Sequence, residues 1–146
     1  GGSAFGQVMN KIGNDVPNVK SASYLKNVFN TLQHLIIEKQ IVAGHDIASG
    51  GLVTTILEMC FSNNNIGANI DLTALQETDA IKVLFAENVG VVIQSTNDQI
   101  ESVFSKKLNA KWGGLAYNEF EPMHAVAPIL KNLKILNCLI FLIKSK

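Results

Sequence analysis

The chain has 146 residues, which is the usual size of one domain. Twelve lysines balance twelve acidic residues, arginine is absent, and charged residues make up 16% of the chain, against roughly 25% in an average soluble domain. This balance excludes a basic surface for nucleic acid or an anionic membrane, and the 47% apolar content excludes a disordered chain. Without arginine, a phosphate must be held by backbone amides, lysines or a metal ion.

Cysteine usage and hydropathy indicate an intracellular location. Two cysteines, Cys60 and Cys138, are too few for a secreted disulfide scaffold. The longest apolar run, residues 135–143, is interrupted by Asn137 and is shorter than the roughly 20 residues that span a bilayer. No signal peptide is visible and the first residue is not methionine, so we expect a cytoplasmic protein that is part of a larger one.

The first predicted element is an amphipathic helix over residues 24–36, because its apolar residues recur at helical spacing. Its stripe consists of Tyr24, Leu25, Val28, Phe29, Leu32, Leu35 and Ile36. A short apolar run at residues 41–44 predicts a buried strand that ends at His45 and Asp46.

Gly50 and Gly51 then open a second predicted helix. Its apolar stripe consists of Val53, Ile56, Leu57, Cys60 and Phe61. Further strands are predicted at residues 68–72, 90–94 and 114–120, and further helices at residues 80–85 and 96–108. This alternation of helices and strands predicts a layered α/β domain.

Residues 44–52, GHDIASGGL, join a strand end, a His–Asp pair, two glycines and a helix start. Paired glycines let the backbone approach a ligand, amides at a helix N-terminus favour anions, and a nearby carboxylate can hold Mg²⁺. In the plainer alternative, Asp46 or Ser49 only caps the helix and the glycines only turn the chain. Spacing alone favours that alternative, because the segment is neither a Walker A loop nor a dinucleotide-binding fingerprint.

Four ordered sequence blocks resemble the phosphoribosylformylglycinamidine synthase family. The blocks are residues 1–8 (GGSAFGQV), 30–35 (NTLQHL), 44–61 (GHDIASGGLVTTILEMCF) and 84–94 (LFAENVGVVIQ). The resemblance implies the C-terminal domain of the second of two synthetase halves, with a three-layer α/β/α fold and a mixed sheet like that of aminoimidazole ribonucleotide synthetase. Residues 1–121 are expected to form this domain, and residues 122–146 a diverged or truncated C-terminal extension.

The resemblance further implies part of an ATP-dependent carbon–nitrogen ligase of purine biosynthesis. Such an enzyme converts formylglycinamide ribonucleotide to formylglycinamidine ribonucleotide with ATP and glutamine. The chain itself is expected to hold no catalytic residue, to be inactive alone, and to need N-terminal synthetase and glutaminase domains as partners. A homodimer is also considered, and no nucleic acid or membrane partner is expected. Two alternatives stay open: a structural module with a vestigial nucleotide site, or another ATP-dependent enzyme of the same superfamily.

The resemblance also carries expectations for the binding site. Asp46 would hold Mg²⁺ beside bound ATP or ADP. The implied nucleotide-binding residues are Ser49, Gly50, Gly51, Gly2 and Ser3. Where the family has serine this chain has Ala48, whose methyl group cannot form a hydrogen bond, so that contact is lost unless Ser49 replaces it.

Residues beside the implied site receive structural roles. His45 is expected to be a hydrogen-bonded scaffold residue, Glu87 a surface or inter-domain residue, and Cys60 a core residue. Part of the high apolar content is expected to face a partner domain, leaving an exposed apolar patch and a tendency to self-associate in the chain alone.

Overall fold

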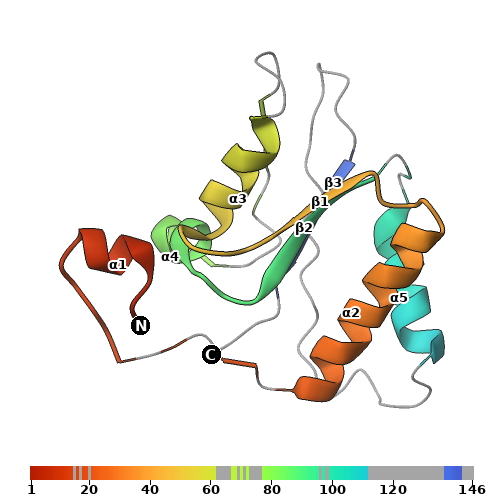
Figure 1. The fold of residues 1–146 in the computed structure, drawn as a ribbon, viewed down its shortest axis with the longest axis horizontal. Coiled ribbons are helices and arrows are strands. Elements are labelled where there is room, and N and C mark those ends of the chain that lie inside the picture. Colours follow the sequence, from red (N-terminus) through yellow and green to blue (C-terminus); the bar gives the residue numbers. More distant parts are fainter. Residues whose placement is uncertain are drawn as a thin grey trace.

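The computed structural model describes residues 1–14, 16, 18–19, 21–61, 67–68, 70, 72, 77–95, 97, 99–111 and 137–142. Within these ranges the chain forms helices α1 (Ala4–Val8), α2 (Ala22–Ile37), α3 (Gly51–Cys60), α4 (Ala80–Phe85) and α5 (Ile100–Lys111). The strands are β1 (Ala43–Asp46), β2 (Gly90–Ser95) and β3 (Asn137–Leu142) (Figure 1). The predicted α/β class is confirmed.

The predicted helix at residues 24–36 is confirmed as α2. Its N-cap is Ser21, whose hydroxyl oxygen accepts the Tyr24 N–H at 3.2 Å. The buried face is narrower than the predicted stripe, because Phe29 and Ile36 are exposed. Thr31 is buried instead, and its hydroxyl donates to the carbonyl one turn earlier at 2.8 Å, so its polar group is satisfied inside the helix.

Strand β2 is the central strand of the described sheet, whose order is β1-β2-β3. It pairs antiparallel with β1 through Ala43↔Gln94 to Asp46↔Val91, and antiparallel with β3 along its whole length. The prediction of a strand at residues 90–94 is confirmed. The strand predicted at 41–44 begins two residues later, and it is mostly exposed rather than buried because β1 forms an edge of the described sheet.

Two apolar clusters lie on opposite faces of β2, because consecutive residues of a strand point to opposite sides. The first joins Ile93 to Val28 and Leu35 of α2 and to Ile100 and Phe104 of α5. The second joins Val92 to Ile47 and Leu52, with Ile56, Met59, Ile70, Leu72 and Val83 packed against it. Helices α2 and α5 therefore cover one face of β2, and α3 and α4 the other (Figure 1).

The remaining predictions have mixed outcomes. Helix α3 is confirmed, but its buried side is formed by Leu52 and Thr55, so the true stripe is turned by about one residue from the predicted one. Leu57 and Phe61 are consequently exposed, and Cys60 is half-buried rather than a core residue. The helix predicted at 80–85 is confirmed as α4. The helix predicted at 96–108 is confirmed as α5, which begins four residues later than predicted, at Ile100.

Two predicted strands receive no support from the described residues. Positions 68, 70 and 72 are not in a strand, whereas positions 69 and 71 and the predicted strand at 114–120 lie outside the described residues. The predicted C-terminal extension, residues 122–146, contains β3, which pairs with the central strand.

Large apolar side chains are exposed on several elements, as the apolar composition suggested. The most exposed are Val8, Ile12, Val16, Ile37 and Phe61. Among the described residues, no helix has both the length and the hydropathy needed to cross a membrane.

The core assignment predicts different effects for two phenylalanine substitutions. Phe104→Ala is expected to lower the free energy of unfolding by about 3–5 kcal/mol, because this side chain is 0% exposed and its removal leaves a cavity. Phe29→Ala is the matched control and should cost less than about 1 kcal/mol, because Phe29 is 58% exposed. Urea denaturation of the 146-residue chain measures both, and equal losses would contradict the assignment.

Candidate functional site

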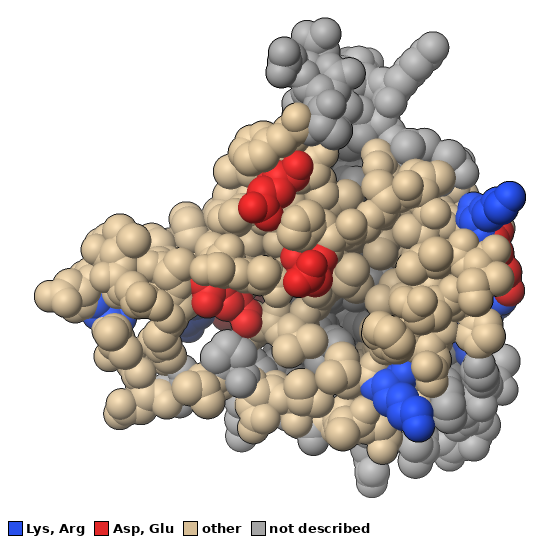
Figure 2. All heavy atoms as spheres, in the orientation of Figure 1, with Lys and Arg blue, Asp and Glu red and all other residues tan. Residues whose placement is uncertain are grey.

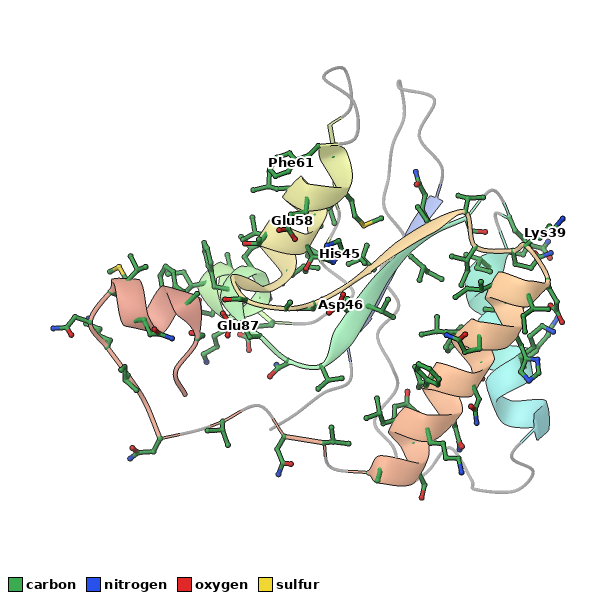
Figure 3. All side chains as sticks on the ribbon, in the orientation of Figure 1. Lys39, His45, Asp46, Glu58, Phe61 and Glu87 are labelled. Carbon is green, nitrogen blue, oxygen red and sulfur yellow. The ribbon has the colours of Figure 1, made fainter. Side chains whose placement is uncertain are left out.

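Three sequence segments that lie far apart in the chain meet at the start of α3. The Glu87 Oε1 atom, in the turn after α4, accepts hydrogen bonds from the Ala4 N–H and the Gly50 N–H, each at 2.8 Å. Figure 3 shows Glu87 beside α4 and the turn that leads from β1 into α3. Glu87 is half-buried and bonded within the domain, which corrects the surface part of the expected surface or inter-domain role; the inter-domain part stays a prediction.

The turn before α3 depends on two glycines in the left-handed region. Gly50 has φ 90° and Gly51 has φ 75°, as the paired-glycine motif predicted. A Cβ atom on Gly51 would lie 2.7 Å from both the Leu84 carbonyl oxygen and the Phe85 carbonyl carbon. The turn therefore packs directly against the backbone at the end of α4, a contact that only glycine allows.

The backbone amides of this turn already have partners inside the domain. The Gly50 N–H donates to Glu87 and the Gly51 N–H donates to the Ala48 carbonyl at 3.1 Å. Gly50 is the N-cap residue of α3 and makes no side-chain capping bond, so the helix starts on neither Asp46 nor Ser49. Ser49 is exposed next to the turn.

Asp46 ends β1 and presents its carboxylate to solvent, with 82% of the side chain exposed. Its carbonyl oxygen is held by two partners: His45 Nδ1 lies 2.7 Å away, and the Thr55 hydroxyl donates at 3.2 Å. His45 Nε2 also lies 3.2 Å from Glu58 Oε2, so His45 links the end of β1 to α3. This geometry supports the scaffold role expected for His45.

The site is acidic. Figure 2 shows acidic side chains over α3 and β1, and Figure 3 identifies Glu58, Asp46 and Glu87 in that region. Among the described residues, no group of three or more His, Cys, Asp or Glu side chains is arranged to hold a metal ion. The exposed Asp46 carboxylate still fits Mg²⁺, which is usually held by one or two carboxylates together with phosphate and water oxygens.

The N-terminal block, residues 1–8, also contacts this site. The Ser3 hydroxyl oxygen caps α1 by accepting the Gly6 N–H at 3.2 Å, and the Gly2 carbonyl accepts a bond from the Gln7 side chain at 2.6 Å. Phe5 stacks on Phe85 with ring centroids 4.5 Å apart. Through Ala4 and Glu87, the structure thus joins the segment of Gly2 and Ser3 to that of Gly50 and Gly51.

Sequence reasoning missed Glu87 as the residue that joins these segments. Its two partners lie 83 and 37 positions away, so local pattern analysis holds no signal for the bonds. One usable signal was the set of four motif blocks: Glu87 lies in one block, and its two hydrogen-bond donors, Ala4 and Gly50, lie in two of the others.

The fold and site define an α/β domain in which a glycine-dependent turn and a helix N-terminus lie beside an exposed carboxylate. A family model described as "AIR synthase related protein, C-terminal domain" matches residues 1–113, and the chain belongs to this family.

Curated relatives agree with that assignment. The chain is 45% identical over 106 residues to "Probable phosphoribosylformylglycinamidine synthase, chloroplastic/mitochondrial" of Arabidopsis thaliana, covering 73% of this chain and 7% of that protein. It is 41% identical over 116 residues to "Phosphoribosylformylglycinamidine synthase" of Dictyostelium discoideum, covering 75% and 8%. It is 37% identical over 117 residues to "Probable phosphoribosylformylglycinamidine synthase" of Caenorhabditis elegans, covering 73% of this chain and 9% of that protein. The chain spans less than a tenth of these relatives.

The packing of the turn predicts a strong effect for Gly51→Ala. The new Cβ would force a left-handed alanine and overlap the backbone of α4, so we expect a loss of about 2–4 kcal/mol of unfolding free energy. Gly67→Ala is the control, because a Cβ there meets nothing within 4 Å, and its effect should stay within about 1 kcal/mol. Denaturant unfolding tests the pair, and a tolerated alanine at position 51 would contradict the described turn.

Proposed function

We propose that the chain is one domain of a phosphoribosylformylglycinamidine synthase, an enzyme that uses ATP and glutamine to convert formylglycinamide ribonucleotide to formylglycinamidine ribonucleotide. The observation that carries this proposal is the 37–45% identity to three proteins with that name. The convergence of three of the four motif blocks around Glu87 supports it, since these blocks form one local structure. Because the chain spans 7–9% of those relatives, turnover requires further domains that bind substrate and release ammonia from glutamine.

For the domain of residues 1–121 we propose the three-layer α/β/α arrangement with a mixed sheet, to which β3, from residues 122–146, adds a strand. The placement of α2 with α5 and of α3 with α4 on opposite faces of β2 supports the layers. Both described strand pairings are antiparallel, so the proposed parallel pairing would involve other residues. We also propose a cytoplasmic location and a homodimer of the chain.

We further propose that Asp46 holds Mg²⁺ and that ATP or ADP lies against Ser49, Gly50, Gly51, Gly2 and Ser3. The exposed carboxylate of Asp46 supports the metal part of this proposal. Its position just before the N-terminus of α3 supports the nucleotide part, because helix N-termini favour anions such as phosphate. When bound, Mg²⁺ neutralises phosphate charge. Gly50 would act through its compact backbone, because its N–H is committed to Glu87. Ala48 offers no hydroxyl, so the adjacent Ser49 is the remaining hydroxyl in the turn.

The metal proposal predicts the effect of Asp46→Asn in the complete synthase. Loss of the carboxylate charge should weaken MgADP binding by about tenfold or more, because the amide is a much poorer Mg²⁺ ligand. Asp79→Asn is the matched control: Asp79 caps α4 from the surface, and asparagine is an equally good cap. Titration calorimetry with MgADP measures both. Unchanged binding in Asp46→Asn would support the structural module with a vestigial site instead.

The domain assignment predicts that the 146-residue chain alone has no synthase activity. An assay with formylglycinamide ribonucleotide, ATP, Mg²⁺ and ammonia should show no release of ADP above background. The intact Dictyostelium relative serves as the positive control in the same assay. Turnover by the chain alone would contradict the proposal.

A further inference from the structure

The Glu87 carboxylate is positioned by two bonds of equal length from separate parts of the chain. One oxygen atom, Oε1, accepts the N–H groups of Ala4 and Gly50 at 2.8 Å each. Bonds from N–H groups to a carboxylate are charge-assisted and stronger than neutral ones. The half-buried setting of Glu87 limits competition from water, so these bonds hold the two segments in a fixed relation.

Glu87 provides, from outside α3, the hydrogen-bond acceptor for the N-cap N–H that the sequence of this helix lacks. In a capping box, a glutamate in the first turn accepts the backbone N–H of the N-cap residue. Here the N-cap is Gly50, which has no side chain, and the third helical residue is Val53. Glu87 accepts the N-cap N–H in their place, from 37 positions further along the chain.

The Thr55 side chain connects the Gly50–Gly51 turn to the backbone of Asp46. This threonine is 1% exposed, and its hydroxyl lies 3.2 Å from the Asp46 carbonyl oxygen and 3.3 Å from the Gly51 carbonyl oxygen. A hydroxyl has one hydrogen to donate, so the two carbonyls share it. A shift of the Gly50–Gly51 turn therefore alters the contact that holds the backbone of Asp46.

We propose that Glu87 is a positioning residue: it fixes the Gly50–Gly51 turn, and through Thr55 it orients the backbone carbonyl of Asp46, whose place on the sheet is given by its pairing with β2. In this role Glu87 fills the place that an anion would otherwise take at the Gly50 N–H, so a nucleotide phosphate binds beside this amide and not on it. The nucleotide part of the inference rests on the proposed function; the fixing of the turn does not.

The test compares Glu87→Ala and Glu87→Gln with the control Glu77→Gln. Glu77 is a matched control because its Oε1 also accepts a backbone N–H, from Asp79 at 3.0 Å, but within an exposed local turn. The first readout is amide hydrogen exchange at Ala4 and Gly50 in the 146-residue chain. The second is MgADP affinity in the complete synthase that contains it.

In Glu87→Ala, exchange at Ala4 and Gly50 should become at least about tenfold faster, while protection in α2 and β2 stays unchanged. Added formate should restore the protection, because it replaces the missing carboxylate. Glu87→Gln should have a smaller effect, since its amide oxygen still accepts, and it serves if the alanine variant fails to fold. Glu77→Gln should leave both amides unchanged. Unchanged exchange at Gly50 in both Glu87 variants would overturn the proposal.

The affinity readout separates positioning from plain stability. MgADP affinity should fall in Glu87→Ala by about tenfold and recover in part with formate. Faster exchange without a loss of affinity would overturn the positioning role. If the unsubstituted synthase does not bind MgADP, the proposed function fails, and the exchange readout still decides whether Glu87 fixes the turn.

Discussion

The contact between Gly51 and the backbone at the end of α4 is the constraint on which the rest of the site depends. An ordinary residue at position 51 would meet Leu84 and Phe85 at 2.7 Å, so only a glycine lets α3 start this close to α4. That approach brings the turn after α4 within hydrogen-bonding distance of the turn before α3, and the Glu87 carboxylate then bonds across it. The same carboxylate reaches Ala4 and secures the N-terminal block, which Phe5 reinforces by stacking on Phe85.

Strand β2 connects this site to the two apolar clusters. Its pairing with β1 places Asp46 opposite Val91, so the register of the two strands fixes the position of the Asp46 backbone. Val92 then packs toward α3 and Ile93 toward α2 and α5. The site residues on β1 and α3 are therefore positioned by a strand that is itself fixed from both faces, which suits a site that needs rigid spacing.

Patterns of neighbouring residues predicted where helices and strands lie better than they predicted which side of each element is buried. The glycines at 50 and 51, the periodicity of α2 and the apolar run of β2 were sufficient to locate these elements, because each depends on neighbouring residues. The buried side of α3 was misplaced because Thr55, a polar residue, faces inward to bond two carbonyls. Neither β3 nor the Glu87 bonds were predicted, since they join segments more than 35 positions apart and leave no periodic trace.

The charge distribution restricts how a nucleotide can bind here. Asp46 and Glu58 lie together on one side of the molecule, whereas Lys39 lies at the far end of α2 (Figure 3). Arginine is absent from the whole chain. A polyphosphate approaching Asp46 would meet the carboxylates of Asp46 and Glu58, and in the proposed site a divalent cation bound to Asp46 would offset their charge. Because the Glu87 carboxylate already accepts the Gly50 N–H, this amide is not free to attract a phosphate, and in the proposed site that attraction would fall to a cation on Asp46.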